Sequence, residues 1–251
     1  MSTSIVVLVV IEIILMIGIP VAAVLVTRRK WGLPLSIVLA GAITFVASQI
    51  LHVPANNLLA RAFDLETQPL IVQALVLGLS AGVFEEAARY VVMRFWQKDI
   101  RSWRQAFSLG LGHGGVEALL IGLTMALTLA NMIVIINAED VAALGLPEGA
   151  AEQVAAFWEM PLYTPLLAVL ERVMAMTLHL ALSTVVALCF TKRTIWPLFA
   201  AILWHAFADA LAVYGVQTWG TVAVEGILLV LGLLSVAILL LTKRQLTGAE
   251  Q

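Results

Sequence analysis

The chain has 251 residues, of which 62 % are apolar and only 12 % are charged. Its mean hydropathy of +1.02 lies far above the values of soluble globular domains and excludes that class. We therefore expect an all-α polytopic membrane protein whose solvent is the lipid bilayer.

Apolar windows of about 20 residues predict seven membrane-spanning helices. In chain order they cover residues 4–26, 33–51, 69–94, 105–137, 161–190, 195–215 and 221–242. We expect a single membrane domain over residues 1–251: two accessory helices in 1–68, a four-helix core formed by the third to sixth spans in 69–215, and a last accessory helix with a tail in 216–251. The connections 52–68 and 138–160 should lie outside, the second with a short amphipathic element, and His52 should be an ordinary surface histidine in the first.

Basic residues between the spans predict the orientation. They gather in alternate connections: Arg28, Arg29 and Lys30; Arg94, Lys98, Arg101 and Arg104; Lys192 and Arg193; Lys243 and Arg244. The other three connections hold one basic residue, Arg61, against seven acids. This alternation places the N-terminus outside and the C-terminus in the cytoplasm. The net charge of −2 is then the sum of a basic inner face and an acidic outer face, and it does not indicate a nucleic-acid partner.

Four of the predicted spans carry ionisable residues in their middles. They are Glu85, Glu86 and Arg89 in the third; His113 and Glu117 in the fourth; Glu171, Arg172 and His179 in the fifth; and His205 and Asp209 in the sixth. Ionisable groups in hydrocarbon are costly, so such residues usually serve chemistry or transport. With a rise of about 1.5 Å per residue, helices running in alternate directions bring them to one level, roughly 12–17 Å from the cytoplasmic ends. We therefore expect one buried site that opens toward the cytoplasmic half.

Spacing within each helix supports a common site, because residues four apart share a face. Glu85 with Arg89, and His113 with Glu117, are such pairs, as are His179 with Ser183 and His205 with Asp209. Glu86 is one residue away from Glu85, so one carboxylate can face the site as a general base while Arg89 or a neighbouring helix holds the other. Glycines at 110, 112, 114 and 115 indicate either close helix packing or room for a substrate beside His113.

The run Gly82 to Tyr90 (GVFEEAARY), the run Gly110 to Glu117 (GLGHGGVE), Glu171-Arg172 with His179, and His205 with Asp209 together resemble the YhfC family of intramembrane proteases. That family is similar to the type II CAAX prenyl endopeptidases, the PrsW-type proteases and the Aph subunit of gamma-secretase. The resemblance covers about residues 69–215 and implies a bacterial inner-membrane peptidase acting on a membrane-associated protein or peptide. It implies that Glu85 or Glu86, with His113, activates a water, and that His205 stabilises the oxyanion or helps to bind that water.

Two departures separate the chain from the CAAX endopeptidases. Those enzymes usually have one more residue between the acid pair and the arginine, and an asparagine where this chain has Asp209. An ionised aspartate cannot donate to an oxyanion, so Asp209 is expected to orient His205 or to bind a metal. A prenyl-CAAX substrate is therefore not expected.

The sequence leaves two alternatives for the cofactor, a metal ion or none. His113, His179 and His205 from three helices could form a zinc site with a glutamate as base, although no HExxH pair is present. A metal-free mechanism with glutamate and histidine is the other alternative.

Two further classes of function compete with the peptidase. One is a non-catalytic membrane scaffold or immunity-type protein with the same fold, and the other is a proton-coupled transporter. Some of the intramembrane charges also have a purely structural interpretation. We expect Glu171–Arg172 to be a structural ion pair, and Glu12 and Glu225 on the flanking helices to pair or to snorkel rather than to catalyse.

Overall fold

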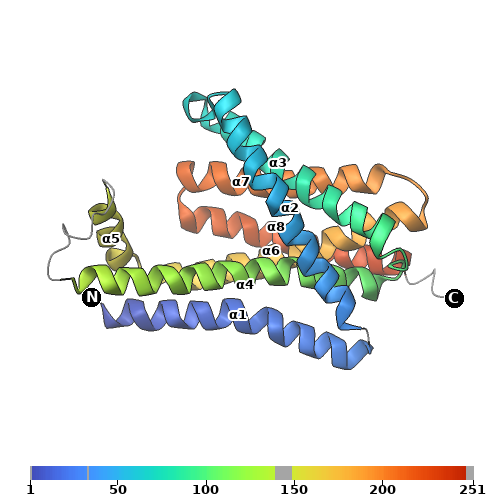
Figure 1. The fold of residues 1–251 in the computed structure, drawn as a ribbon, viewed down its shortest axis with the longest axis horizontal. Helices are drawn as coiled ribbons and strands as arrows, with labels where there is room; N and C mark the ends of the chain where they lie inside the picture. The colour runs from blue at the N-terminus through green and yellow to red at the C-terminus, as the bar shows by residue number, and fades with distance from the viewer. Residues whose placement is uncertain (1, 33, 139–148, 247–251) are drawn as a thin grey trace.

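The computed structural model describes residues 2–32, 34–138 and 149–246, and the regular structure in these ranges is helical (Figure 1). The elements are α1 (Thr3–Trp31), α2 (Leu35–Ala62), the 3-10 helix η1 (Leu65–Thr67), α3 (Leu70–Val91), the π-helix η2 (Val92–Trp96), α4 (Trp103–Ile136), α5 (Ala150–Glu159), α6 (Thr164–Thr191), α7 (Trp196–Thr218) and α8 (Thr221–Leu246). Within the described ranges, seven helices are long and apolar enough to cross a membrane, with α3 continuing through η2. The predicted fold class is confirmed.

Local signals set the ends of several helices. Ser102 caps α4 by accepting from the Gln105 backbone, while the Gln105 side chain accepts from the Ser102 backbone. Gly32 ends α1 in the left-handed conformation, at φ 64°, which glycine adopts without steric cost. Successive spans run antiparallel, and the start of α1 and the end of α8 lie at opposite ends of the molecule (Figure 1).

Helix α2 is much longer than the apolar window predicts. It runs to Ala62, whereas the predicted span ended at residue 51. The window fails there because the polar side chains of the last turns, including His52 and Asn56, contact other parts of the protein instead of water or lipid. The predictions of an outer connection from residue 52 and of a surface position for His52 are therefore wrong.

The predicted short element between the fourth and fifth spans corresponds to α5. Its Phe157 and Trp158 pack against Ile5, Val9 and Leu129, so one side of the helix is held by α1 and α4. Residues 139–148 of the same connection lie outside the described part of the chain.

Glycines bring the helices around the site into backbone contact. A Cβ built at Gly41 of α2 would lie 2.0 Å from the carbonyl oxygen of Leu109, and one at Gly112 of α4 would lie 1.8 Å from that of Val38. Gly78 and Gly82 of α3 face the backbone of α7 in the same way, at 2.5 and 2.6 Å. These small-residue contacts are the usual means of close helix approach in membranes. They support the packing interpretation of the glycines in α4.

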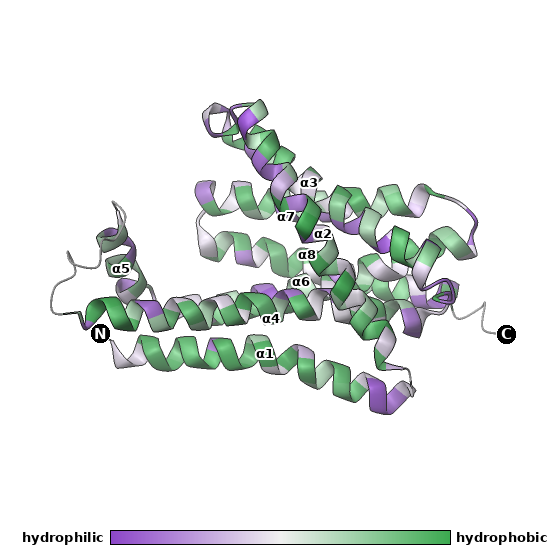
Figure 2. Ribbon diagram, viewed as in Figure 1, coloured by the Kyte–Doolittle hydropathy of each residue, from purple (hydrophilic) through white to green (hydrophobic). Residues whose placement is uncertain are grey.

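The remaining spans lie outside this group. Helix α1 packs along α4, and α8 packs along α6 (Figure 1). Hydrophobic residues dominate the helices, and hydrophilic residues gather toward the helix ends and the α2–α3 connection (Figure 2). Helices α2, α3, α4, α6 and α7 therefore enclose the polar residues.

Candidate active site

Glu85 of α3 lies at the centre of the polar cluster. Its Oε1 accepts from Nε2 of Gln49 on α2 at 2.9 Å. Its Oε2 lies 3.0 Å from Nε2 of His113 on α4 and 3.8 Å from Nε2 of His205 on α7. One buried carboxylate thus connects three other helices.

Glu86 makes a second ion pair on the neighbouring face of α3. Its Oε1 pairs with Arg89 and lies 2.8 Å from Nδ1 of His205. Glu86 and Arg89 are both completely buried. The sequence left open which of the two carboxylates Arg89 would hold. The observed partner is Glu86, because residues three apart are also neighbours on a helix and the next residue points about 100° away. Because Arg89 pairs with Glu86, the contacts of Glu85 are with side chains of α2, α4 and α7.

His179 of α6 links this pair to a second ionic group. Arg89 Nη2 donates to His179 Nδ1 at 3.1 Å, because a guanidinium can only donate. His179 Nε2 therefore carries the proton and donates to Glu117 Oε2 at 2.7 Å. The other oxygen of Glu117 accepts from Arg172 at 2.8 Å, and Arg172 also pairs with Glu171. The expected structural pair of Glu171 and Arg172 is present, and the carboxylate of Glu117, expected beside His113, serves His179 instead.

Asp209 joins the cluster at a cavity between α6, α7 and α8. Its Oδ2 lies 3.5 Å from Nε2 of His205, and its side chain is 40 % exposed. Asp209, Glu171 and Arg172 line the cavity together with apolar side chains, and about 70 Å³ of it is open to water-sized molecules. That is room for several waters. The cavity extends from Asp209 toward the start of α6, which is the outer end in the expected orientation.

The structure therefore brings the sequence-predicted residues into one connected group. Its members are Glu85, Glu86, Arg89, His113, Glu117, His179, His205 and Asp209. Gln49 was not among the candidates. The signal that could have found it is a set of polar residues at 49, 52 and 56 on one side of an apolar stretch.

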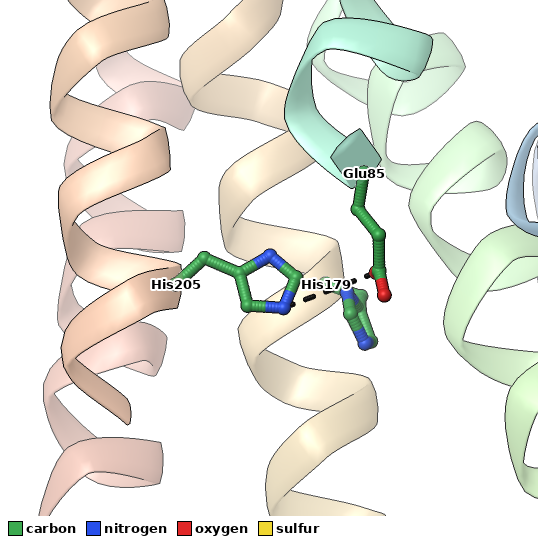
Figure 3. Close-up of side chains that lie close together, drawn as sticks. All are labelled: Glu85, His179 and His205. Carbon is green, nitrogen blue, oxygen red and sulfur yellow. Dashed lines mark ion pairs between the residues drawn. The ribbon is translucent and has the colours of Figure 1, made fainter. Parts of the chain in front are cut away.

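The donor set fits a divalent metal. Among the described residues, Glu85, His179 and His205 offer ligand atoms that all lie within 4.8 Å of one another (Figure 3). Two ligands about 2.1 Å from one zinc ion at the tetrahedral angle are about 3.4 Å apart. The 3.8 Å between His205 and Glu85 and the 3.5 Å between His205 and Asp209 are close to that spacing. The sequence suggested His113, His179 and His205 as metal ligands. In the structure Glu85 takes the place of His113, and His113 contacts Glu85.

Comparisons with known proteins identify the family of the chain. An uncharacterized membrane protein, YhfC of Bacillus subtilis (strain 168), is 30 % identical over 203 residues, which cover 77 % of this chain and 78 % of the relative. No solved structure matches the chain. The family model described as YhfC intramembrane metalloprotease matches residues 13–230, a range that includes every residue of the cluster. The chain therefore belongs to the YhfC intramembrane metalloprotease family.

Proposed function

We propose that this protein is an intramembrane peptidase that hydrolyses a peptide bond of a membrane-associated protein or peptide. The observation that carries the proposal is the position of Glu85, a buried carboxylate with two histidines of two other helices at one of its oxygens. Carboxylates and histidines that lie side by side can act as general bases and acids, and the family description supports hydrolysis.

Substrate would reach the cluster through the cavity between α6, α7 and α8. Its walls are mainly apolar, as a membrane-embedded segment requires, and Asp209 lies between the cavity and His205. The same cavity has room for the water that hydrolysis consumes. A peptide bond beside Asp209 would lie next to the histidine and the glutamate that carry the chemistry.

Without a metal, Glu85 is the group that orients the attacking water and takes its proton. Gln49 fixes one oxygen of the carboxylate, and His113 fixes the direction of the other. His205 contacts Glu85, Glu86 and Asp209, so it is placed to pass a proton to the leaving amine. Arg89 balances Glu86 and keeps that second carboxylate out of the reaction.

With a metal, Glu85, His179 and His205 would be the ligands. When bound, a metal such as zinc supplies Lewis-acid chemistry that activates water and polarises the carbonyl. Glu117 would then orient His179 through Nε2, the arrangement usual for metal-ligating histidines. Arg89 would release Nδ1 of His179 and stay with Glu86. Because Glu85 would be a ligand, Asp209, which lines the cavity and contacts His205, would be the carboxylate left to take the proton of the water.

The test combines metal analysis of the purified protein with a cleavage assay against membrane-peptide libraries. Substitution Glu85→Gln removes cleavage in both forms, whereas Asp209→Asn is severe only in the metal form. Cleavage at the normal rate by folded Glu85→Gln protein would contradict the peptidase. If no peptide is cleaved and Glu85→Gln disturbs only assembly with a partner protein, the scaffold function replaces it, and uptake of a solute with protons would identify a transporter.

We also propose that the N-terminus lies outside and the C-terminus in the cytoplasm, because basic residues alternate between connections. The test uses a background in which Cys189, the single cysteine, is replaced by serine. An impermeant reagent added outside should label Glu66→Cys and spare Asp99→Cys, both at exposed positions. The reverse pattern would invert the orientation.

A further inference from the structure

A line of polar side chains leads away from Glu85 along α2. Gln49 Nε2 donates to Glu85 Oε1 at 2.9 Å, and Gln49 Oε1 lies 3.3 Å from Nδ1 of His52. His52 Nε2 lies 2.9 Å from Nδ2 of Asn56, whose Oδ1 accepts from the Ser80 hydroxyl at 2.6 Å. Four hydrogen bonds therefore connect Ser80 of α3 to Glu85 on the same helix through three side chains of α2.

With the amide oxygens and nitrogens of Gln49 and Asn56 placed as they are, the chemistry of the groups gives every bond in this line a direction. An amide oxygen only accepts, so Nδ1 of His52 must carry the proton that it shares with Gln49. An amide NH₂ only donates, so Nε2 of His52 must be the bare nitrogen that accepts from Asn56. His52 is thus neutral with its proton on Nδ1, and all four bonds point toward Glu85.

The surroundings of His52 hold the ring in this position. His52 is buried and stacks on Phe84, with ring centroids 5.5 Å apart. Phe84 is the residue before Glu85, so the same turn of α3 supports the histidine and carries the carboxylate. Bonds that all point one way polarise one another, which strengthens the last donor, Gln49.

We propose that Gln49, His52 and Asn56 are positioning residues, and that their one-way line of hydrogen bonds fixes Glu85 with Oε1 turned to α2 and Oε2 turned to His113 and His205. The line holds Oε1 at a donor and so leaves Oε2 as the reacting oxygen. Its part in catalysis rests on the proposed peptidase function, whereas its direction is a property of the fold and can be measured without activity.

The first experiment measures which nitrogen of His52 carries the proton. The chain has 4 histidines, so nitrogen-15 NMR of histidine-labelled full-length protein in bilayers gives few signals, and His52→Gln identifies those of His52. The expected result is a neutral ring protonated at Nδ1. A proton on Nε2 would overturn the proposal.

The second experiment reverses the line with one substitution. Asn56→Asp replaces the donating NH₂ with an accepting oxygen, so Nε2 of His52 should gain a proton while the shape of the side chain is kept. The control is Asn57→Asp, which adds the same charge at the exposed neighbouring position and should leave Nε2 bare. An unchanged His52 in Asn56→Asp would overturn the proposal.

The third experiment connects the line to catalysis. Gln49→Leu should lower kcat about 10–100-fold with little change in KM, the scale usual for partners that orient a catalytic group, and Asn57→Leu should change neither. Normal kcat in folded Gln49→Leu protein would overturn the positioning role. A wild-type protein that cleaves nothing but shows the expected His52 proton and its switch would refute the peptidase and leave the line standing.

Discussion

The helices around the cluster and the two outer spans, α1 and α8, all contain buried glutamates, but the hydrogen-bond partners of these glutamates differ. Glu85 has a partner for each oxygen, supplied by α2 and α4. Glu12 of α1 and Glu225 of α8 are only 2 % and 6 % exposed, and each has a buried oxygen without a hydrogen-bond partner among the described residues, as Glu86 also has. The other oxygen of Glu86 is held by Arg89 and His205, whereas neither outer glutamate forms an ion pair within the described part of the chain. An acid in an apolar span therefore indicates a functional site only when histidines of other helices, such as His113 and His205, converge on it.

The largest difference between the two groups should appear in turnover. Glu85→Gln keeps the shape but removes the proton acceptor or ligand, and should lower turnover by about 10²–10⁴-fold. The matched outer variant is Glu12→Gln, which should cleave at nearly the wild-type rate. Rates of peptide cleavage on folded protein measure both, and an equal loss in the two variants would remove the distinction.

Helix packing should show the next largest difference. Gly41→Ala places a methyl group 2.0 Å from a backbone oxygen of α4, so helices must separate, at a cost of about 3 kcal/mol in unfolding free energy. The control on an outer helix is Gly18→Ala, where nothing lies within 4 Å. Unfolding titrations in detergent give both values. Equal unfolding free energies of the two variants would mean that α2 and α4 can move apart at no cost in stability.

The smallest of these effects concerns metal affinity. Glu117→Gln removes the charge and leaves one acceptor oxygen where His179 and Arg172 each use one, so the orientation of His179 loosens and zinc binding should weaken about 10–100-fold. Glu225→Gln, on the outer helix α8, should leave zinc affinity unchanged. Isothermal titration with zinc measures both dissociation constants, and an unaltered affinity in Glu117→Gln would show that His179 is held by other means.

The number of spans and the level of the ionisable residues could be predicted from the sequence. Apolar length identifies a span directly, and the rise per residue converts position into depth. The same calculation places Glu85, His113, His179 and His205 together without any knowledge of contacts. Their meeting in the structure follows from these two regularities.

The partners of each charge could not be predicted in the same way. Which oxygen meets which histidine depends on the rotation of each helix, and that rotation is set by backbone contacts such as Gly41 against Leu109. Which of the two adjacent carboxylates Arg89 holds, Glu86 as it proves, depends on such a rotation. The roles of Gln49 and His52 were missed because isolated polar residues near the end of an apolar window are also typical of the start of a loop.

The pairing of Glu86 with Arg89 on one helix also bears on biosynthesis. His205, the other partner of Glu86, follows it by 119 residues, which a ribosome adding about 5–20 residues per second needs about 6–24 s to produce. During that interval α3 would have to enter the bilayer without α7. A glutamate and an arginine three residues apart can neutralise each other within the helix from the start, so the segment can insert as a locally compensated unit and exchange part of that pairing for the histidine when it arrives.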